Sequence, residues 1–204
     1  MNFHNGYQAI HIKEYMKIPL ILVFLFFSSP LLADDISDFQ IEGMSIGDSL
    51  LDYYNEREIL NNQEEYNKEN KFKTSEFQLT DKSSEYHSVG VYYKNNDNKY
   101  IIHGVSGGIF YINNIENCYS KKNNIVNDLS ILLKNTEWEN NEIKDVDGYF
   151  LFDYAYLKSG IVEVSCYDWN NELEMKGWTD HLKVRLLSNE LNNWINSIDT
   201  IYSD

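Results

Sequence analysis

Short runs of alternating apolar and polar residues dominate the middle of the chain and fall into two pairs. The first pair covers residues 86–93 and 100–110, on either side of an Asn-Asn-Asp-Asn segment. The second pair covers residues 149–157 and 161–169, on either side of a Lys-Ser-Gly segment. A period of two residues interrupted by turn residues is typical of antiparallel strands. The pattern therefore predicts two β-hairpins.

The loop of the first hairpin also predicts a register. A turn centred on Asn96 and Asp97 pairs residues whose numbers add up to 193. One face of the hairpin then carries only apolar and aromatic side chains, which are Val89, Val91, Tyr93, Tyr100 and Ile102. A face of this kind lines a core.

Apolar residues recur at helical spacing in three other segments. The clearest helix is expected over residues 114–134, and two more over residues 48–60 and 188–201. Residues 182–187 are expected to form a further short strand. The expected loops, which are rich in polar residues, are 61–76, 135–147 and 170–179. For residues 61–76, a frayed extension of the preceding helix is the alternative.

The predicted order is helix, two strands, helix, two or three strands, helix. It lacks the strictly alternating strands and helices of a parallel sheet. We therefore expect an α+β domain, an antiparallel sheet with its helices packed on one face. The succession also allows two helix-plus-hairpin units.

The N-terminal segment has the features of a secretory signal. Lys17 precedes an apolar run that extends to Phe27, and Ala33 provides a small residue for cleavage. The run is about half of the roughly 20 residues that a membrane-spanning helix needs, and Pro30 interrupts it. Residues 1–33 are thus expected to be a signal peptide, with Met16 as an alternative start, and residues 34–204 a single periplasmic or secreted domain without a membrane anchor.

The charge balance excludes one class of partner. The whole chain has a formal net charge of −15, and removing residues 1–33, which hold two lysines and one glutamate, changes this to −16. Phosphate backbones repel such a surface, so nucleic acid is not an expected partner. A protein or a small ligand remains as the expected partner.

Both cysteines belong to the expected mature domain. An even number of cysteines in an exported protein favours a disulfide. Cys118 lies in the first turn of the middle helix, and Cys166 shares one side of its strand with Val162 and Val164. We predict a bond between Cys118 and Cys166; two buried free thiols are the alternative.

Three stretches resemble a family of small exported proteins from AT-rich marine alphaproteobacteria. They are residues 41–53 (IEGMSIGDSLLDY), 100–118 (YIIHGVSGGIFYINNIENC) and 161–169 (IVEVSCYDW). No activity is assigned to that family, so the resemblance implies none. The GMSIGDS segment is also similar to the helix entry of periplasmic modules of the β-lactamase-inhibitor-like and outer-membrane-assembly types. That similarity implies a protein-binding role.

One motif suggests catalysis. Residues 104–108 fit the G-x-S-x-G pattern of a serine-hydrolase nucleophile, and Asp153 or Asp168 followed by His181 completes the hydrolase order around Ser106. A nucleophile elbow requires a turn from a strand into a helix, whereas the residues after Ser106 continue a strand pattern. A glycine-relieved strand is therefore the preferred interpretation.

The other polar motifs favour structure over chemistry. His87 and His103 are expected on opposite faces of the first hairpin, so they do not predict a shared metal site. The Asp145-Val-Asp-Gly segment lacks the distal glutamate of a calcium loop. We expect no metal and no cofactor.

The tryptophans are the remaining candidates for binding. Trp138 and Trp178 lie in expected loops and are the candidates for an exposed surface that stacks on a ligand such as a sugar ring. The interpretation that fits these features is a non-enzymatic periplasmic or secreted binding protein of unknown ligand. A serine hydrolase using Ser106 is the alternative.

Overall fold

The computed structural model describes residues 35–64 and 71–199, so the predicted signal peptide lies outside the described residues. The helices are η1 (Ile36–Asp38), η2 (Leu50–Asp52), α1 (Glu56–Asn61), α2 (Ile115–Leu132), α3 (Asn171–Met175) and α4 (Asn189–Asp199). The strands are β1 (Phe72–Gln78), β2 (Ser88–Lys94), β3 (Ile102–Phe110), β4 (Trp138–Lys144), β5 (Gly148–Tyr156), β6 (Gly160–Trp169) and β7 (His181–Ser188).

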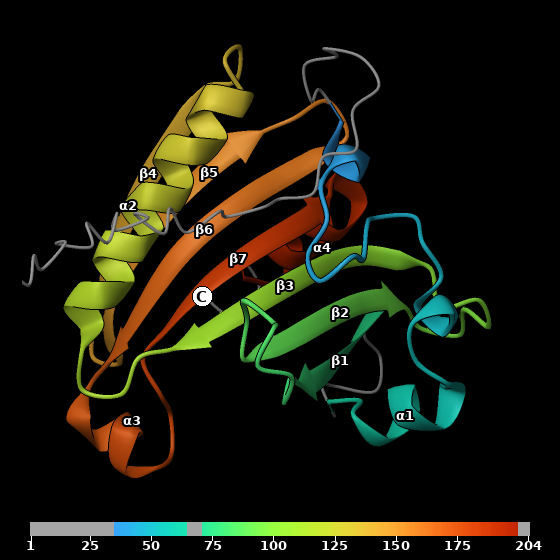
Figure 1. Cartoon of the computed structure of the whole chain (residues 1–204), viewed down its shortest axis with the longest axis horizontal. Helices are drawn as coiled ribbons and strands as arrows, with labels where there is room; N and C mark the ends of the chain where they lie inside the picture. The colour runs from blue at the N-terminus through green and yellow to red at the C-terminus, as the bar shows by residue number, and fades with distance from the viewer. Residues whose placement is uncertain (1–34, 65–70, 200–204) are drawn as a thin grey trace, which may run out of the picture.

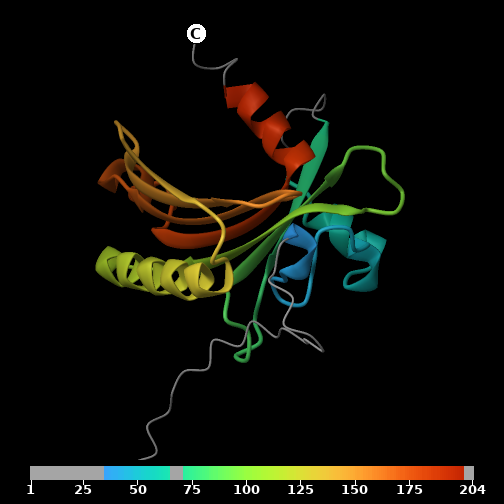
Figure 2. The ribbon, with the colours of Figure 1, turned by 90° about the horizontal axis from the view of Figure 1, so that it is seen from above.

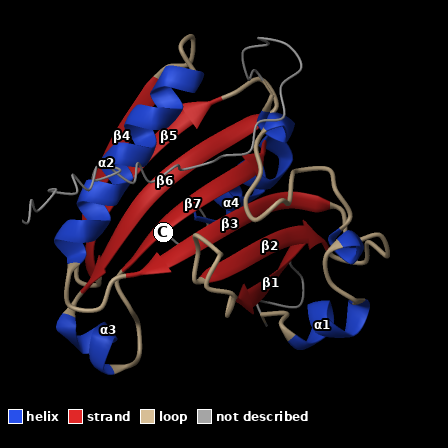
Figure 3. Cartoon of the chain, viewed as in Figure 1, coloured by secondary structure: helices blue, strands red, loops and turns tan. Residues whose placement is uncertain are grey.

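All of these strands form one antiparallel sheet with the order β1-β2-β3-β7-β6-β5-β4 (Figure 1). The chain builds β1 to β3 as a meander and crosses the sheet through α2 to the far edge. It then returns through β4, β5 and β6 until β7 pairs with β3. The predicted α+β class and antiparallel sheet are confirmed, and each meander follows a helix, as Figure 3 shows.

The main core lies between the sheet and α2. Cys118 and Leu129 on α2 are buried, and they face the fully buried Val164 and Cys166 of β6 and Leu182 of β7. The apolar segment before β1, including η1 and η2, completes this core beside β3, β6 and β7. The helix forms because its apolar residues recur at helical spacing toward this one face.

The predicted disulfide is present in this core. Cys118 and Cys166 are bonded, with their Cα atoms 6.1 Å apart. The bond ties the first turn of α2 to β6, as the alternation of residues 162, 164 and 166 predicts.

One part of the fold prediction needs correction: the helices do not all lie on one face. Figure 2 shows α2 and α4 on opposite sides of the sheet. Leu191 of α4 packs over Gly104, where an added Cβ would come within 2.5 Å of the leucine side chain. The amphipathic α4 has its own apolar contacts, with Trp194 against Phe72 at a ring-centroid distance of 5.3 Å.

Both edge strands were predicted as loops, which is wrong. β1 begins within the expected loop 61–76 and extends two residues beyond it, and β4 lies within the expected loop 135–147. The side chains of β4 are almost all exposed. Because neither face of this strand is buried, its sequence shows no alternation of apolar and polar residues. Pairing with a neighbouring strand, rather than burial, makes each of these segments a strand.

The register of the first hairpin also differs from the prediction. Gly90, not His87, lies opposite Ser106, and the pairing shifts at a bulge between Tyr92 and Tyr93. The carboxylate of Asp97 accepts hydrogen bonds from the backbone N–H groups of Lys99 and Ile101, which lengthens the loop. The apolar face itself is as predicted, since its residues are buried.

The remaining differences concern helix ends. The expected helix over residues 48–60 is two pieces, η2 and α1, because Asn55 starts a new helix by accepting a hydrogen bond from the Glu58 N–H. The expected loop 170–179 contains the short helix α3. Within residues 35–64 and 71–199, no helix combines the length and apolar character of a membrane span.

Candidate functional site

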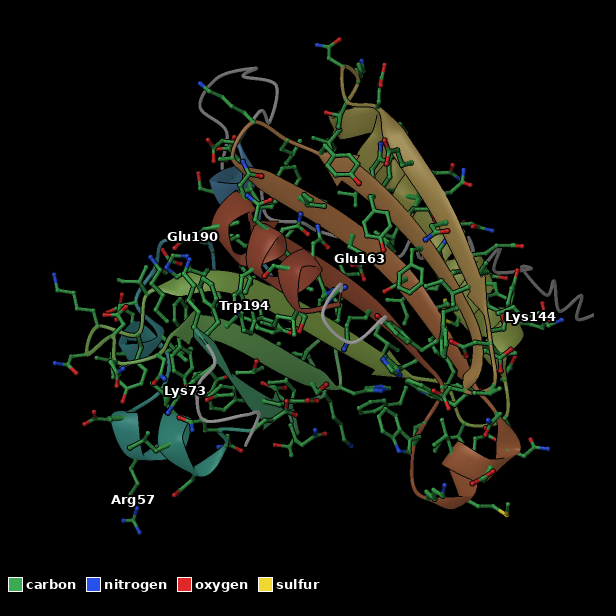
Figure 4. All side chains as sticks on the ribbon, turned by 180° about the vertical axis from the view of Figure 1, so that it is seen from behind. Arg57, Lys73, Lys144, Glu163, Glu190 and Trp194 are labelled. Atoms are coloured by element: carbon green, nitrogen blue, oxygen red, sulfur yellow. A yellow bond between two sulfur atoms is a disulfide. The ribbon has the colours of Figure 1, made fainter. Side chains whose placement is uncertain are left out.

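The sheet face opposite α2 carries a continuous band of aromatic side chains, which we call the aromatic face. It consists of Phe110 on β3, Phe150, Phe152, Tyr154 and Tyr156 on β5, Tyr167 and Trp169 on β6, His181 on β7, and Trp178 in the loop before β7. Strand alternation places these residues on one side, because successive side chains point to opposite faces. Figure 4 views the sheet from this side.

The rings contact one another from one end of the band to the other. Tyr154 lies 6.5 Å from Tyr156 and 5.9 Å from Phe152, measured between ring centroids. At the other end Trp169 lies 4.5 Å from Trp178 in an edge-to-face arrangement. The two ends are the most accessible parts, with Tyr156 49% and Trp178 52% exposed. The band thus has rigid, mutually packed rings between two exposed ones.

Local structure fixes the position of Trp178. Asn170 caps α3 by accepting a hydrogen bond from the Leu173 N–H at 2.9 Å. The chain then turns at Gly177, whose φ of +97° favours glycine, and the Trp178 N–H donates to the Leu173 carbonyl. The Asp180 carboxylate accepts a hydrogen bond from the Trp169 N–H, which joins this loop to β6. The indole of Trp178 is therefore held beside Trp169 by backbone geometry.

An ion pair lies in the middle of the aromatic face. Glu163 on β6 and Arg185 on β7 are directly opposite each other and are joined by a hydrogen-bonded salt bridge. The Glu163 side chain is 1% exposed, and its second oxygen accepts a hydrogen bond from Ser165 at 2.8 Å. Removing two charges from water is costly, so a buried pair is weak evidence of a purely stabilising role.

Two donors on this face have no acceptor among the residues that the structure describes. Among the described residues, three buried side-chain donors lack a hydrogen-bond partner, and two of them are Arg185 Nε and Trp169 Nε1 on the aromatic face. The third belongs to Trp138, on the other face. Buried donors without a partner are rare in folded proteins and mark positions that need an explanation. Both atoms are themselves buried, so a ligand oxygen reaches them only if neighbouring side chains move.

Small residues occupy this face of the neighbouring strands β2 and β3. Gly90, Ser106 and Gly108 lie on the same face as Arg185, on β2 and β3. A Cβ at Gly90 would come within 2.8 Å of Ser106 Oγ, so a larger residue at this position would require the serine side chain to move. All three residues are buried.

Burial shifts the pKa values of the titratable side chains on the aromatic face. Desolvation, and next the neighbouring charge of Lys183, lowers the pKa of His181 to about 4. Desolvation, and next the charge of Glu163, raises the pKa of Tyr167 to about 12. Burial opposes the charge of Arg185, but Glu163 outweighs it and raises the pKa of the guanidinium. At neutral pH the face thus presents neutral rings around one compensated ion pair, together with the ammonium of Lys183, which lies 5.5 Å from the Tyr167 ring centroid.

The chain matches no protein-family model, no curated protein and no solved structure. The resemblance to exported alphaproteobacterial proteins therefore stays a prediction. The assignment of the site rests on its own residues.

The structure does not bring the predicted hydrolase residues together. Ser106 lies in the middle of β3, which continues unbroken to Phe110, and its hydroxyl donates to the Gly90 carbonyl at 3.3 Å. His181 is four positions along β7 from the residue opposite Ser106, or roughly 13 Å along the sheet. Asp168 points to the other face and accepts a hydrogen bond from Tyr119 of α2. Asp153, the second acidic candidate, pairs with Lys122 on that same face.

The two tryptophan candidates differ. Trp178 is exposed and completes the aromatic face, as its predicted role requires. Trp138 begins β4 and is partly buried against the core, so the prediction that it lies in a loop is wrong. The sequence contained a signal for the rest of the site: in residues 163–169, every second position carries a polar or aromatic side chain that ends on this face.

The histidines are also apart. His87 accepts a hydrogen bond from the Phe110 N–H, whereas His103 lies beside Phe72 and Glu190 near α4. No cluster of three or more histidine, cysteine, aspartate or glutamate side chains with metal-binding geometry occurs in the described part of the chain.

Proposed function

We propose that the protein is a non-enzymatic binding protein, exported from the cytoplasm, that holds its ligand on the aromatic face. The single observation that carries this proposal is the coincidence of unpartnered buried donors and packed rings on one sheet face. Arg185 Nε and Trp169 Nε1 lack acceptors there, and the exposed ring of Trp178 lies beside Trp169.

The chemistry of the face favours a ligand with flat apolar surfaces and oxygen acceptors. The rings offer stacking surfaces, and the free N–H groups require acceptors. The pyranose rings of a polysaccharide combine apolar faces with hydroxyl oxygens. We therefore assign a carbohydrate chain as the ligand class, in place of a protein or other small ligand.

The compartment is part of the proposal. The disulfide between Cys118 and Cys166 suits an oxidising environment, in agreement with the signal-peptide pattern before residue 34. N-terminal sequencing of the secreted protein is expected to begin near Asp34. Recovery of an uncleaved chain from the membrane fraction would contradict export as a free domain.

A pull-down tests the binding function. The mature protein is incubated with insoluble polysaccharides of different linkage, namely cellulose, chitin and peptidoglycan, and the fraction that sediments is measured. At least one polymer is expected to retain the wild-type protein, and Trp178→Ala is expected to reduce that retention. Equal retention of the two proteins, or no retention on any polymer, would contradict the proposal.

A serine hydrolase using Ser106 was the alternative. No observation of the structure favours it, because Ser106, His181 and Asp168 occupy separate places on two faces of the sheet. The binding function is therefore the one proposed.

A further inference from the structure

A second, polar groove lies on the other side of the sheet, between α2 and the β4–β5 hairpin. Its volume is about 540 Å³, within the range of roughly 300–1,000 Å³ that is usual for small-molecule sites. The groove is lined by Lys122, Asn123, Val126 and Asn127 from α2, Asn140, Asn141 and Glu142 from β4, and Leu151, Phe152 and Asp153 from β5. None of these residues belongs to the aromatic face except Phe152, which contributes to both.

Two charges at the base of the groove occupy positions that would normally be apolar. Lys122 lies one helical turn after Cys118 and is buried like it, with its side chain 8% exposed. Asp153 lies opposite the fully buried Val164 on the core side of β5. The two side chains form an ion pair. Charged groups at core-facing positions are costly and commonly mark a functional site.

The ion pair does not use all of its hydrogen-bonding capacity. Lys122 carries three N–H donors, and the structure gives it one partner, Asp153. The second Asp153 oxygen accepts no hydrogen bond from the described residues. Donors and acceptors therefore remain available at the base of the groove.

Four asparagine residues line the groove, but the side chain of Asn141 points away from α2, because this residue pairs with Phe152. They are Asn123 and Asn127 on the helix and Asn140 and Asn141 on the edge strand. None of these side-chain amides hydrogen-bonds another group in residues 35–64 or 71–199, and all four residues are exposed. Each amide offers both a donor and an acceptor. Glu142 adds an acceptor, which already receives a hydrogen bond from Tyr149.

The charge of the groove selects the class of ligand. Lys122 and Asp153 compensate each other, and Glu142 leaves the lining slightly negative. An anion would also meet the net charge of −15 of the whole chain, so it is disfavoured. A hydroxyl group can both donate and accept a hydrogen bond. It can therefore bind to the side-chain amides, to the Asp153 carboxylate and to the Lys122 ammonium of this lining. Val126 and Leu151 supply an apolar wall for the carbon skeleton.

We propose that this groove binds a neutral, polyhydroxylated small molecule of the size of a mono- or disaccharide. Lys122 and Asp153 hold hydroxyl groups at the base, and the amides of Asn123, Asn127 and Asn140 hold those at the rim. The site lies on α2 and the edge hairpin, so it does not rest on the function proposed for the aromatic face.

Two-dimensional ¹H–¹⁵N NMR of the mature protein tests the assignment. The probes are D-glucose, D-galactose, N-acetyl-D-glucosamine, maltose and cellobiose, with a capped dipeptide as a non-saccharide. At least one saccharide is expected to shift the side-chain amide resonances of Asn123 and Asn127 in a saturable way. Asn127→Ala is expected to weaken binding about fivefold, the usual effect of one lost hydrogen bond.

The same helix provides the control. Asn124 is exposed on α2 but does not line the groove, so Asn124→Ala is expected to leave the affinity unchanged. Trp178→Ala is expected to have no effect either, which separates this site from the aromatic face. The assignment is overturned if no saccharide shifts these amides, if the dipeptide alone does, or if Asn124→Ala weakens binding as much as Asn127→Ala.

Discussion

Glu163 and Arg185 face each other across β6 and β7, and their ion pair lies in the middle of the aromatic face. Figure 4 shows Glu163 on this surface beside α4. Within residues 35–64 and 71–199 the Nε of Arg185 has no acceptor, and the Glu163 carboxylate is almost completely buried. This Nε is itself buried, so an oxygen atom of a ligand reaches it only if the side chains around it move.

The first prediction concerns this ion pair. Glu163→Gln keeps the shape of the side chain but leaves the Arg185 charge buried without its counterion. We expect the free energy of unfolding to fall by about 3 kcal/mol, measured by urea denaturation. The exposed Lys176–Glu172 pair is the control, and Glu172→Gln is expected to change stability by less than about 0.5 kcal/mol. Equal effects at the two pairs would contradict the role given to burial.

The second prediction concerns the disulfide. Replacing Cys118 and Cys166 together by serine opens a loop with a sequence separation of 48. On the chain-entropy model this lowers stability by about 4 kcal/mol. Thermal unfolding of the wild type with and without reductant provides the measurement. Alkylation of two thiols in the denatured, unreduced protein would show that the bond is absent.

The third prediction concerns acid stability. The pKa of His181 is about 4 in the folded protein, below its unfolded value of 6.5. As the pH falls, the unfolded chain therefore binds the proton at this histidine before the folded protein does. The contribution of His181 to stability is fully present above pH 6.5 and is lost as the pH decreases toward 4. His181→Phe keeps an aromatic ring beside Tyr167 and is expected to flatten this dependence.

Other groups have shifted pKa values in a similar pH range, and one of them provides the control for that experiment. Burial also lowers the pKa of His103, so His103→Gln is expected to remove a smaller contribution of the same sign. Burial raises the pKa of Asp180, which has the opposite effect at lower pH. Lys183 and Tyr167 remain unchanged in both variants. An identical slope between pH 4 and 6.5 in the wild type and His181→Phe would show that His181 is not the cause.

The fourth prediction concerns Ser106. Its hydroxyl lies in a continuous strand and makes one long hydrogen bond to Gly90, so Ser106→Ala is expected to change stability by about 1 kcal/mol or less. A fluorophosphonate probe is expected to leave the folded protein unlabelled. Labelling of Ser106 that disappears in the alanine variant would instead favour the hydrolase.

Local sequence predicted the parts of the fold whose own residues are buried. Cys118 and Leu129 lie on the core side of α2. Because the chain has only two cysteines, their number allowed one pairing, and the alternation around Cys166 predicted that its side chain faces the core. The edge strands were missed because the strand character of β4 depends on its pairing with β5, not on its own side chains. Such pairing is a tertiary property that no local pattern reveals.

The centre of the site could not be predicted for a similar reason. Glu163 has the alternation of a solvent-facing strand residue, and Arg185 is 22 residues away in the sequence. Only the pairing of β6 with β7 brings them together and buries them. Trp178 could be identified, because a tryptophan in a polar loop is unusual, but its contact with Trp169 depends on the fold of α3 and Gly177.

The central claim is that the aromatic face holds a carbohydrate chain, and a fluorescence titration tests it most directly. Soluble oligosaccharides of the polymer that retains the protein are titrated while tryptophan emission is recorded. Trp178→Ala is expected to weaken binding by about tenfold, as loss of one stacking ring of roughly 1–1.5 kcal/mol implies. Met175, 83% exposed in α3 but outside the ring contacts, is the control, and Met175→Ala is expected to bind like the wild type. Unchanged affinity in Trp178→Ala, or equal weakening in both variants, would contradict the account.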